Sequence, residues 1–174
     1  LAAASKELLA REIPGLSLGL SLQQVLKVRA MLKRYAEGDR EGLKVFHESL
    51  GKDSSALYFF DGETGGIGRL RRVQIASNVK NAEAVVARVQ QRETQLGPPT
   101  GVWDCPPAPG QIPSRRYSYK RGPASAMEVY VLVREQTAIT YYVGSTSDQR
   151  ASLAQAGCTP TPPERAARFP VAVP

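Results

Sequence analysis

The sequence predicts an α+β protein, built from a helical hairpin plus small antiparallel sheet units flanked by helices. Apolar residues recur at helical spacing near the N-terminus, and β-branched and aromatic runs occur around residues 56–76 and 127–143. Strands followed by helices favour the α+β class. We expect residues 1–97 to hold the helical hairpin, a β-hairpin and a helix, residues 98–122 to form a proline-rich, basic linker, and residues 123–174 to form a partial domain.

The helical hairpin is expected in the first third of the chain. Ser21 and Gln24 form an S-x-x-Q capping box, and Gly38 supplies a stop. The apolar residues at helical spacing between them are Leu22, Val25, Leu26, Met31, Leu32 and Tyr35. A second helix is expected over residues 39–51. His47 lies on its apolar stripe, which indicates a packed histidine rather than a catalytic base.

A β-hairpin and a helix are expected next. Residues 56–60 and 67–76 have strand composition, and residues 61–66 have turn composition. We interpret the glycines here as a hairpin tip rather than a phosphate-binding loop, because no Gly-Lys-Ser/Thr follows. Asn78 is the expected cap of the helix that follows, and Gly97 with two prolines ends it.

Prolines and glycines dominate residues 97–113, which predicts a linker or surface arm and a domain boundary. We expect Trp103, within this segment, to anchor the arm in a protein groove. Cys105 and Cys158 lie far apart and outside any C-x-x-C spacing, and His47 is the only histidine, so no zinc site is indicated. We interpret both cysteines as free thiols, which fits a reducing, intracellular compartment.

The composition favours a polyanionic partner. The chain has 23 Lys and Arg against 16 Asp and Glu, a net charge of +7. Arginines follow the glycine-rich turn, and a second basic run interleaves cations with tyrosines, which suits phosphates and bases. The candidate nucleic-acid-binding residues are Arg69, Arg71, Arg72, Arg115, Arg116, Tyr117, Tyr119, Lys120 and Arg121.

A possible catalytic motif lies in the last third of the chain. Residues 127–133 and 140–148 read as two strands joined by a tight turn, the first with Tyr130 and the second with Tyr142 and Gly144. These segments resemble the paired motifs of GIY-YIG endonucleases. The resemblance implies a small sheet flanked by helices and metal-assisted phosphodiester hydrolysis. It assigns Tyr130 and Tyr142 to the attacking water and implies that both rings share one face of neighbouring strands. A turn centred near Gln136 and Thr137 is expected to pair Tyr130 with a position close to Tyr142 or Val143.

The match to this family is incomplete. Glu128 and Val129 stand where the family has Gly-Ile, and Arg150 comes about two positions early for the arginine that holds the phosphate. The expected third strand of the family begins at residues 168–173. No carboxylate matches the family's metal ligand, since Glu164 precedes that strand. We therefore expect no metal site and no cleavage by this chain alone.

Three functions remain open at this stage. The first is a non-catalytic, nucleic-acid-associated component of a larger ribonucleoprotein assembly, such as a mitochondrial or chloroplast ribosome, which binds RNA in preference to DNA together with other proteins and needs no cofactor. The second is a piece of a structure-specific endonuclease of DNA repair, using Mg²⁺ with Tyr130, Tyr142 and Arg150. The third is a purely structural subunit. No run of 18 apolar residues occurs, so no membrane partner is expected.

Overall fold

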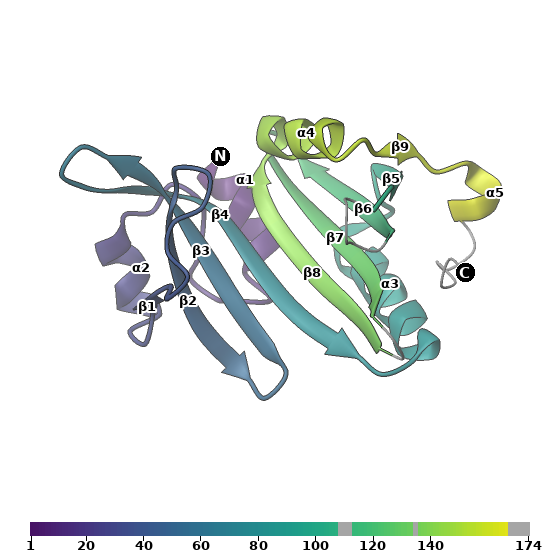
Figure 1. Ribbon diagram of the computed structural model, residues 1–174, viewed down its shortest axis with the longest axis horizontal. Coiled ribbons are helices and arrows are strands. Elements are labelled where there is room, and N and C mark those ends of the chain that lie inside the picture. Colours follow the sequence, from purple (N-terminus) through teal and green to yellow (C-terminus); the bar gives the residue numbers. More distant parts are fainter. Residues whose placement is uncertain (108–112, 134–135, 167–174) are drawn as a thin grey trace.

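The computed structural model describes residues 1–107, 113–133 and 136–166. Within these ranges nine strands form one antiparallel sheet, in the order β1-β2-β3-β4-β8-β7-β6-β5-β9 (Figure 1). The strands are β1 (Lys33–Arg34), β2 (Lys44–Gly51), β3 (Ser54–Glu63), β4 (Gly66–Val79), β5 (Gly101–Cys105), β6 (Ser114–Arg121), β7 (Ala124–Val133), β8 (Gln136–Ser145) and β9 (Thr159–Pro160). The helices are α1 (Ala2–Leu9), α2 (Leu22–Val28), α3 (Ala82–Leu96), α4 (Thr146–Gln155) and α5 (Pro163–Ala166). No helix in these ranges is both long and apolar enough to cross a membrane.

The prediction of a helical hairpin plus small sheet units is wrong, because one large sheet organises the molecule. The first predicted helix exists as α2, and its capping box at Ser21 and Gln24 is confirmed. It ends at Val28, however, and Met31 is 73% exposed rather than part of an apolar stripe. The second predicted helix is strand β2, in which Phe46 and Glu48 face the core. Strand alternation, supported by pairing with β1 and β3, thus prevails over the helical spacing of the apolar residues.

The segment predicted to be a linker contributes two strands to the same sheet. Its proline-rich part contains β5, and its basic part forms β6, which pairs with β5 and β7. Residues 1–97 and 123–174 are also joined directly, because β4 pairs with β8 from Val73↔Val143 to Val79↔Thr137. One sheet therefore runs through all three expected units. The third strand expected at residues 168–173 lies outside the described residues.

Several local predictions are confirmed. The hairpin around the glycine-rich turn is β3–β4, and the two strands around Tyr130 and Tyr142 are β7–β8. The predicted helix of the middle region is α3, which ends at Gly97, where a positive φ of 78° favours glycine. Its cap is Asn81, since Asn78 lies in β4. The cap is three residues later than predicted because the strand before it is longer.

The two faces of the sheet are covered unequally. α1 and α3 lie behind the sheet in Figure 1, whereas α4 lies in front of it, at one end of β7 and β8. The face toward α1 and α3 carries the main core, with Tyr58, Phe60 and Tyr141 among its fully buried side chains. The opposite face carries a smaller cluster beneath α4, built on Met127 and Leu153. On this face, among the described residues, α4 therefore covers only part of the sheet and leaves sheet surface open beside it.

The prediction of free thiols is wrong, because Cys105 and Cys158 form a disulfide. The two residues are 53 positions apart in the sequence. Strand β9 pairs with β5 through Trp103↔Pro160, which brings the segment after α4 alongside the end of β5. The sequence alone did not indicate that the two cysteines lie close together, because their proximity results from the pairing of β9 with β5.

Replacement of both cysteines, as Cys105→Ala with Cys158→Ala, should lower the free energy of unfolding by about 4 kcal/mol. A disulfide stabilises mainly by restricting the unfolded chain, and a loop of 53 residues gives about this value in the chain-entropy model. Urea denaturation of the oxidised protein and of the double variant measures the difference. A loss below about 1 kcal/mol would contradict this account.

Candidate functional site

The two tyrosines of the predicted catalytic motif lie on opposite faces of the sheet. Tyr130 pairs with Ile139, and Tyr142 pairs with Met127, so the predicted register, which placed Tyr130 opposite Tyr142 or Val143, is wrong. The first ladder pair after the turn is Val133↔Gln136, whereas the prediction centred the turn near Gln136. An odd shift in register moves a side chain to the other face. Tyr130 is buried toward the helices, and Tyr142 lies on the α4 face, so the two rings cannot act on one water molecule.

Arginines after the glycine-rich turn are largely engaged within the protein. Arg71 donates to both carboxylate oxygens of Asp148, at 2.9 and 3.0 Å, and also contacts Asp61. The guanidinium of Arg72 lies 4.1 Å from the centre of the Phe59 ring. Arg69, which is exposed, donates to the carbonyl oxygen of Gly19. Arg71 and Arg72 therefore serve intramolecular packing and ion pairing.

The basic run on β6 is divided by strand alternation. Arg115 is 8% exposed and donates to Asp104 at 2.9 Å, while Tyr117 and Tyr119 are buried in the main core. Arg116 faces the α4 side, where it contacts Ser152 at 3.4 Å and where burial lowers the pKa of its guanidinium. Arg121, at the end of the run, donates to the carbonyl oxygen of Leu96.

Lys120, by contrast, is exposed, and no ion pair to it occurs in the described ranges. The interleaved cations and tyrosines thus do not form one continuous surface patch.

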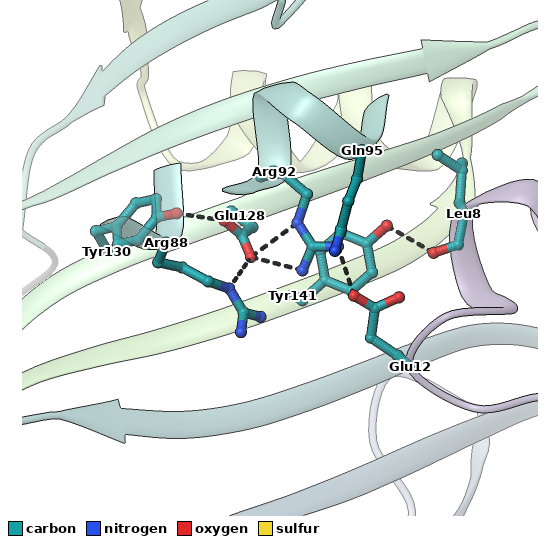
Figure 2. Close-up of polar contacts among 8 residues, drawn as sticks. All are labelled: Leu8, Glu12, Arg88, Arg92, Gln95, Glu128, Tyr130 and Tyr141. Atoms are coloured by element: carbon teal, nitrogen blue, oxygen red, sulfur yellow. Dashed lines mark hydrogen bonds and ion pairs between the residues drawn. The ribbon is translucent and has the colours of Figure 1, made fainter. Parts of the chain in front are cut away.

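The most deeply buried ionic cluster surrounds Glu128 of β7 (Figure 2). Its carboxylate is 0% exposed and accepts from Arg88 at 3.0 Å, from Arg92 at 2.9 Å, and from the Tyr130 hydroxyl. Both arginines belong to α3. Arg92 also donates to Glu12, which follows α1. The cluster therefore ties α3 and the segment after α1 to the centre of the sheet.

Protonation in this cluster is fixed by burial and charge. Burial raises the pKa of Tyr130, and the neighbouring carboxylate of Glu128 raises it further, so the hydroxyl stays neutral. Burial acts to lower the pKa of Arg92, but Glu128, Tyr141 and Glu12 outweigh it, and the pKa is raised. Groups with strongly perturbed pKa values often mark active sites. Glu128, Arg92 and Tyr130 at its centre have almost no exposed surface, so we interpret the cluster as structural.

Glu128→Gln should lower the free energy of unfolding by about 3 to 5 kcal/mol, because it leaves the half-buried Arg88 without a carboxylate partner and the buried Arg92 with Glu12 alone. Chemical denaturation measures the loss. The matched control is Tyr119→Phe, because the buried Tyr119 hydroxyl has no hydrogen-bond partner in the described part of the chain. The control should stay within about 0.5 kcal/mol of the wild type or be more stable. Equal losses in the two variants would contradict the interpretation.

A cleft of about 480 Å³, which we call the α4 cleft, lies between α4 and strands β5 to β7 and has polar and charged side chains in its lining. Its lining residues are Thr100, Gly101, Trp103, Ser118, Lys120, Ser125, Met127, Thr146, Gln149, Arg150, Leu153, Ala154 and Cys158. The α4 residues among them recur at spacings of three and four, so one face of the helix forms the wall. This volume lies in the range of small-molecule sites.

Helix α4 is held to the sheet at both ends. At its start, Ser145 caps the helix and the Thr146 hydroxyl donates to the Gly122 carbonyl oxygen at 3.0 Å. Asp148 is bound by Arg71 of β4. Beyond its end, Cys158 is bonded to Cys105 of β5. The wall of the cleft is therefore fixed in position.

Gln149 is the central polar residue of the cleft. It is 7% exposed, and its Nε2 donates to the carbonyl oxygens of Ser125 at 2.6 Å and Tyr142 at 3.3 Å. This pairing defines the amide orientation, because the reverse orientation would place oxygen against two carbonyl oxygens. Its Oε1 is buried and has no hydrogen-bond partner in the described ranges. Gln149, a residue of the cleft wall, thus carries a buried acceptor without a hydrogen-bond partner.

Sequence reasoning found some residues of this site and missed others. Trp103 was expected in a protein groove and lines the cleft, and Lys120 and Arg150, both named as candidates, line it as well. Gln149 and Leu153 were missed. The signal that could have found them is the spacing of Thr146, Gln149, Arg150 and Leu153 along one helical face, once residues 146–155 are recognised as a helix.

Comparison with known proteins gives no family. No protein-family model matches the chain, and no significant relative was found among curated proteins. A solved structure of a Pseudomonas aeruginosa protein of unknown function is similar, with a TM-score of 0.38 and 18% sequence identity over 83% of this chain and 97% of that chain. A likeness this distant carries no functional argument.

The ion pair between Asp148 and Arg71 should make stability depend on acid pH. Hydrogen bonds from Arg71 lower the pKa of Asp148 in the folded state. The ion pair therefore contributes fully above the pKa that Asp148 has in the unfolded chain, and its contribution is lost as the pH falls through the lower folded-state pKa. Asp148→Asn should cost up to about 1 kcal/mol at pH 7, since the pair is partly exposed. The gap between the two proteins in thermal denaturation should therefore narrow as the pH falls below about 4. A gap that does not change as the protein is acidified would contradict this assignment.

Proposed function

We propose that this chain is a non-catalytic binding protein that takes its ligand in the α4 cleft. The observation that carries the proposal is the buried, unpaired Oε1 of Gln149 in the wall of an open cleft. A buried acceptor without a partner costs about 1 to 3 kcal/mol, which a ligand that donates to it would recover. Trp103, Met127 and Leu153 supply apolar surface beside it. A few polar groups within an apolar lining are typical of ligand sites.

Binding has more support than catalysis because of the chemistry of the lining. No Asp, Glu or His occurs among the described lining residues, and Cys158 is held in a disulfide. His, Asp and Glu are the most usual general bases, and a free cysteine is the strongest common nucleophile. The nuclease alternative also loses support, since Tyr130 faces away from Tyr142 and Arg150.

An oxidising compartment fits this protein better than the reducing compartment expected from the sequence. Disulfides form and persist in secreted, periplasmic and comparable environments. The disulfide between Cys105 and Cys158 supports such a setting. A place in an organelle ribosome correspondingly has less support.

Association with nucleic acid has weaker support than the cleft. Its basis is now the net charge of +7, because Arg71, Arg72, Arg115 and Arg121 all have partners within the chain. Nucleic-acid binding depends on cations free to contact phosphates. We therefore assign the main recognition role to the α4 cleft.

The proposal is tested by fluorescence, because Trp103 is the only tryptophan and lines the cleft. Titration with 8-anilino-1-naphthalenesulfonate, an apolar anion, should change the Trp103 emission saturably. Ala154→Phe fills the cleft from an exposed position on α4 and should weaken binding at least about tenfold, or about 1.4 kcal/mol.

The matched control for this experiment is Ala151→Phe. Ala151 is also exposed on α4 but does not line the cleft, so its substitution should leave the affinity within about twofold of the wild type. No saturable change in the wild type, or equal effects of the two substitutions, would overturn the proposal.

A further inference from the structure

The α4 cleft has a polar, cationic end and an apolar end. Lys120 pairs across the β6–β7 ladder with Ser125, and the carbonyl oxygen of Ser125 accepts from Gln149. Arg150 follows Gln149 on α4, so these residues mark the cationic end. Trp103 and Cys158 lie at the other end, where the disulfide joins β5 to the segment after the helix.

From this polarity we infer that the ligand is a small amphipathic carboxylate, with an apolar tail and an N–H or O–H donor beside its carboxylate group. The inference rests on the proposed function and names the ligand class for the same cleft. The chemistry is that of an N-acylated amino acid or of a peptide C-terminus.

The carboxylate is called for by unneutralised positive charge. Lys120 and Arg150 are both exposed, and neither makes an ion pair with any described residue. No acidic side chain occurs among the described lining residues. The nearby carboxylate of Asp148 is bound by Arg71 on the β4 side of the helix. A ligand carboxylate would therefore meet two cations without competition from the protein's own acids.

The hydrogen-bond donor is called for by Gln149. Both of the hydrogen bonds that its Nε2 makes are to backbone carbonyl oxygens, so the free atom is the acceptor Oε1. A bare fatty acid has a carboxylate and a tail but no donor for this oxygen. An amide N–H one bond from the carbon that bears the carboxylate satisfies it.

The apolar tail is called for by the floor and the far end of the cleft. Met127 and Leu153 pack in one cluster, and the ring of Trp103 lies against it. The ring also lies close to Gly101, where a Cβ would approach the indole Nε1 to 2.9 Å. A side chain at this position would thus displace the ring, and glycine keeps the apolar end in its present shape.

The test compares three probes by Trp103 fluorescence. Octanoylglycine has the tail, the amide N–H and the carboxylate. Octanoylglycinamide lacks the charge, and decanoate lacks the N–H. Octanoylglycine should bind about tenfold more tightly than either of the others. A blocked tetrapeptide ending in leucine with a free carboxylate, measured alongside, distinguishes a peptide C-terminus from a small acylated molecule by which binds more tightly.

A double variant, Lys120→Gln with Arg150→Gln, isolates the charge. The double variant should bind octanoylglycine about tenfold more weakly than the wild type and should bind octanoylglycinamide with unchanged affinity. The control is Lys6→Gln with Lys80→Gln, which removes the same charge at exposed positions outside the cleft and should change neither affinity by more than about twofold.

The outcomes separate the two proposals. If octanoylglycinamide binds as tightly as octanoylglycine, and the Ala154→Phe substitution still blocks the binding of both, the ligand class is wrong and the proposed binding function stands. If decanoate equals octanoylglycine, the donor at Gln149 is not used and the inference in this form is also wrong. If neither these probes nor 8-anilino-1-naphthalenesulfonate changes the emission of Trp103, the proposed binding function itself is wrong.

Discussion

The carboxylate of Glu128 is buried at the centre of the sheet, and a charge in that position has to be neutralised. Arg88 and Arg92 neutralise it from α3, and Arg92 reaches on to Glu12 after α1. This one requirement explains why α3 lies across the face of β7 and why the N-terminal segment is brought to the same point (Figure 2). With that face occupied, the α4 side is the face left to carry an accessible cleft.

The helix that forms the cleft is held by contacts of a different kind. Apart from Leu153, it contributes little apolar surface to the sheet, and instead Asp148, Gln149 and the disulfide beyond its end fix it. A helix held by polar contacts near its start and by a disulfide beyond its end leaves space beneath it, whereas a helix packed through an apolar stripe would close that space. The mode of attachment is therefore what produces a site rather than a second core.

The sequence predicted local features well and long-range arrangement poorly. The capping box at Ser21, the β3–β4 hairpin and the end of α3 at Gly97 depend on neighbouring residues, and each was recognised. Strand β2 was predicted to be a helix, because Leu43, Phe46 and Leu50 also fit helical spacing when the pairing partners are unknown. The register of β7 and β8, the disulfide and the partners of Arg71 and Arg115 all depend on which distant strands meet. Of the cleft, Trp103, Lys120 and Arg150 were named, each for a different reason.

Both ends of the described sheet are formed by strands of only two residues, Lys33–Arg34 in β1 and Thr159–Pro160 in β9. A long, flat outer strand offers a row of unpaired backbone groups on which another chain can add, and natural sheets prevent this with short outer strands, lysine and proline. Here one border carries two cations and the other carries a proline, which has no N–H to donate. The described sheet, although wide, is thereby poorly suited to growth by strand addition.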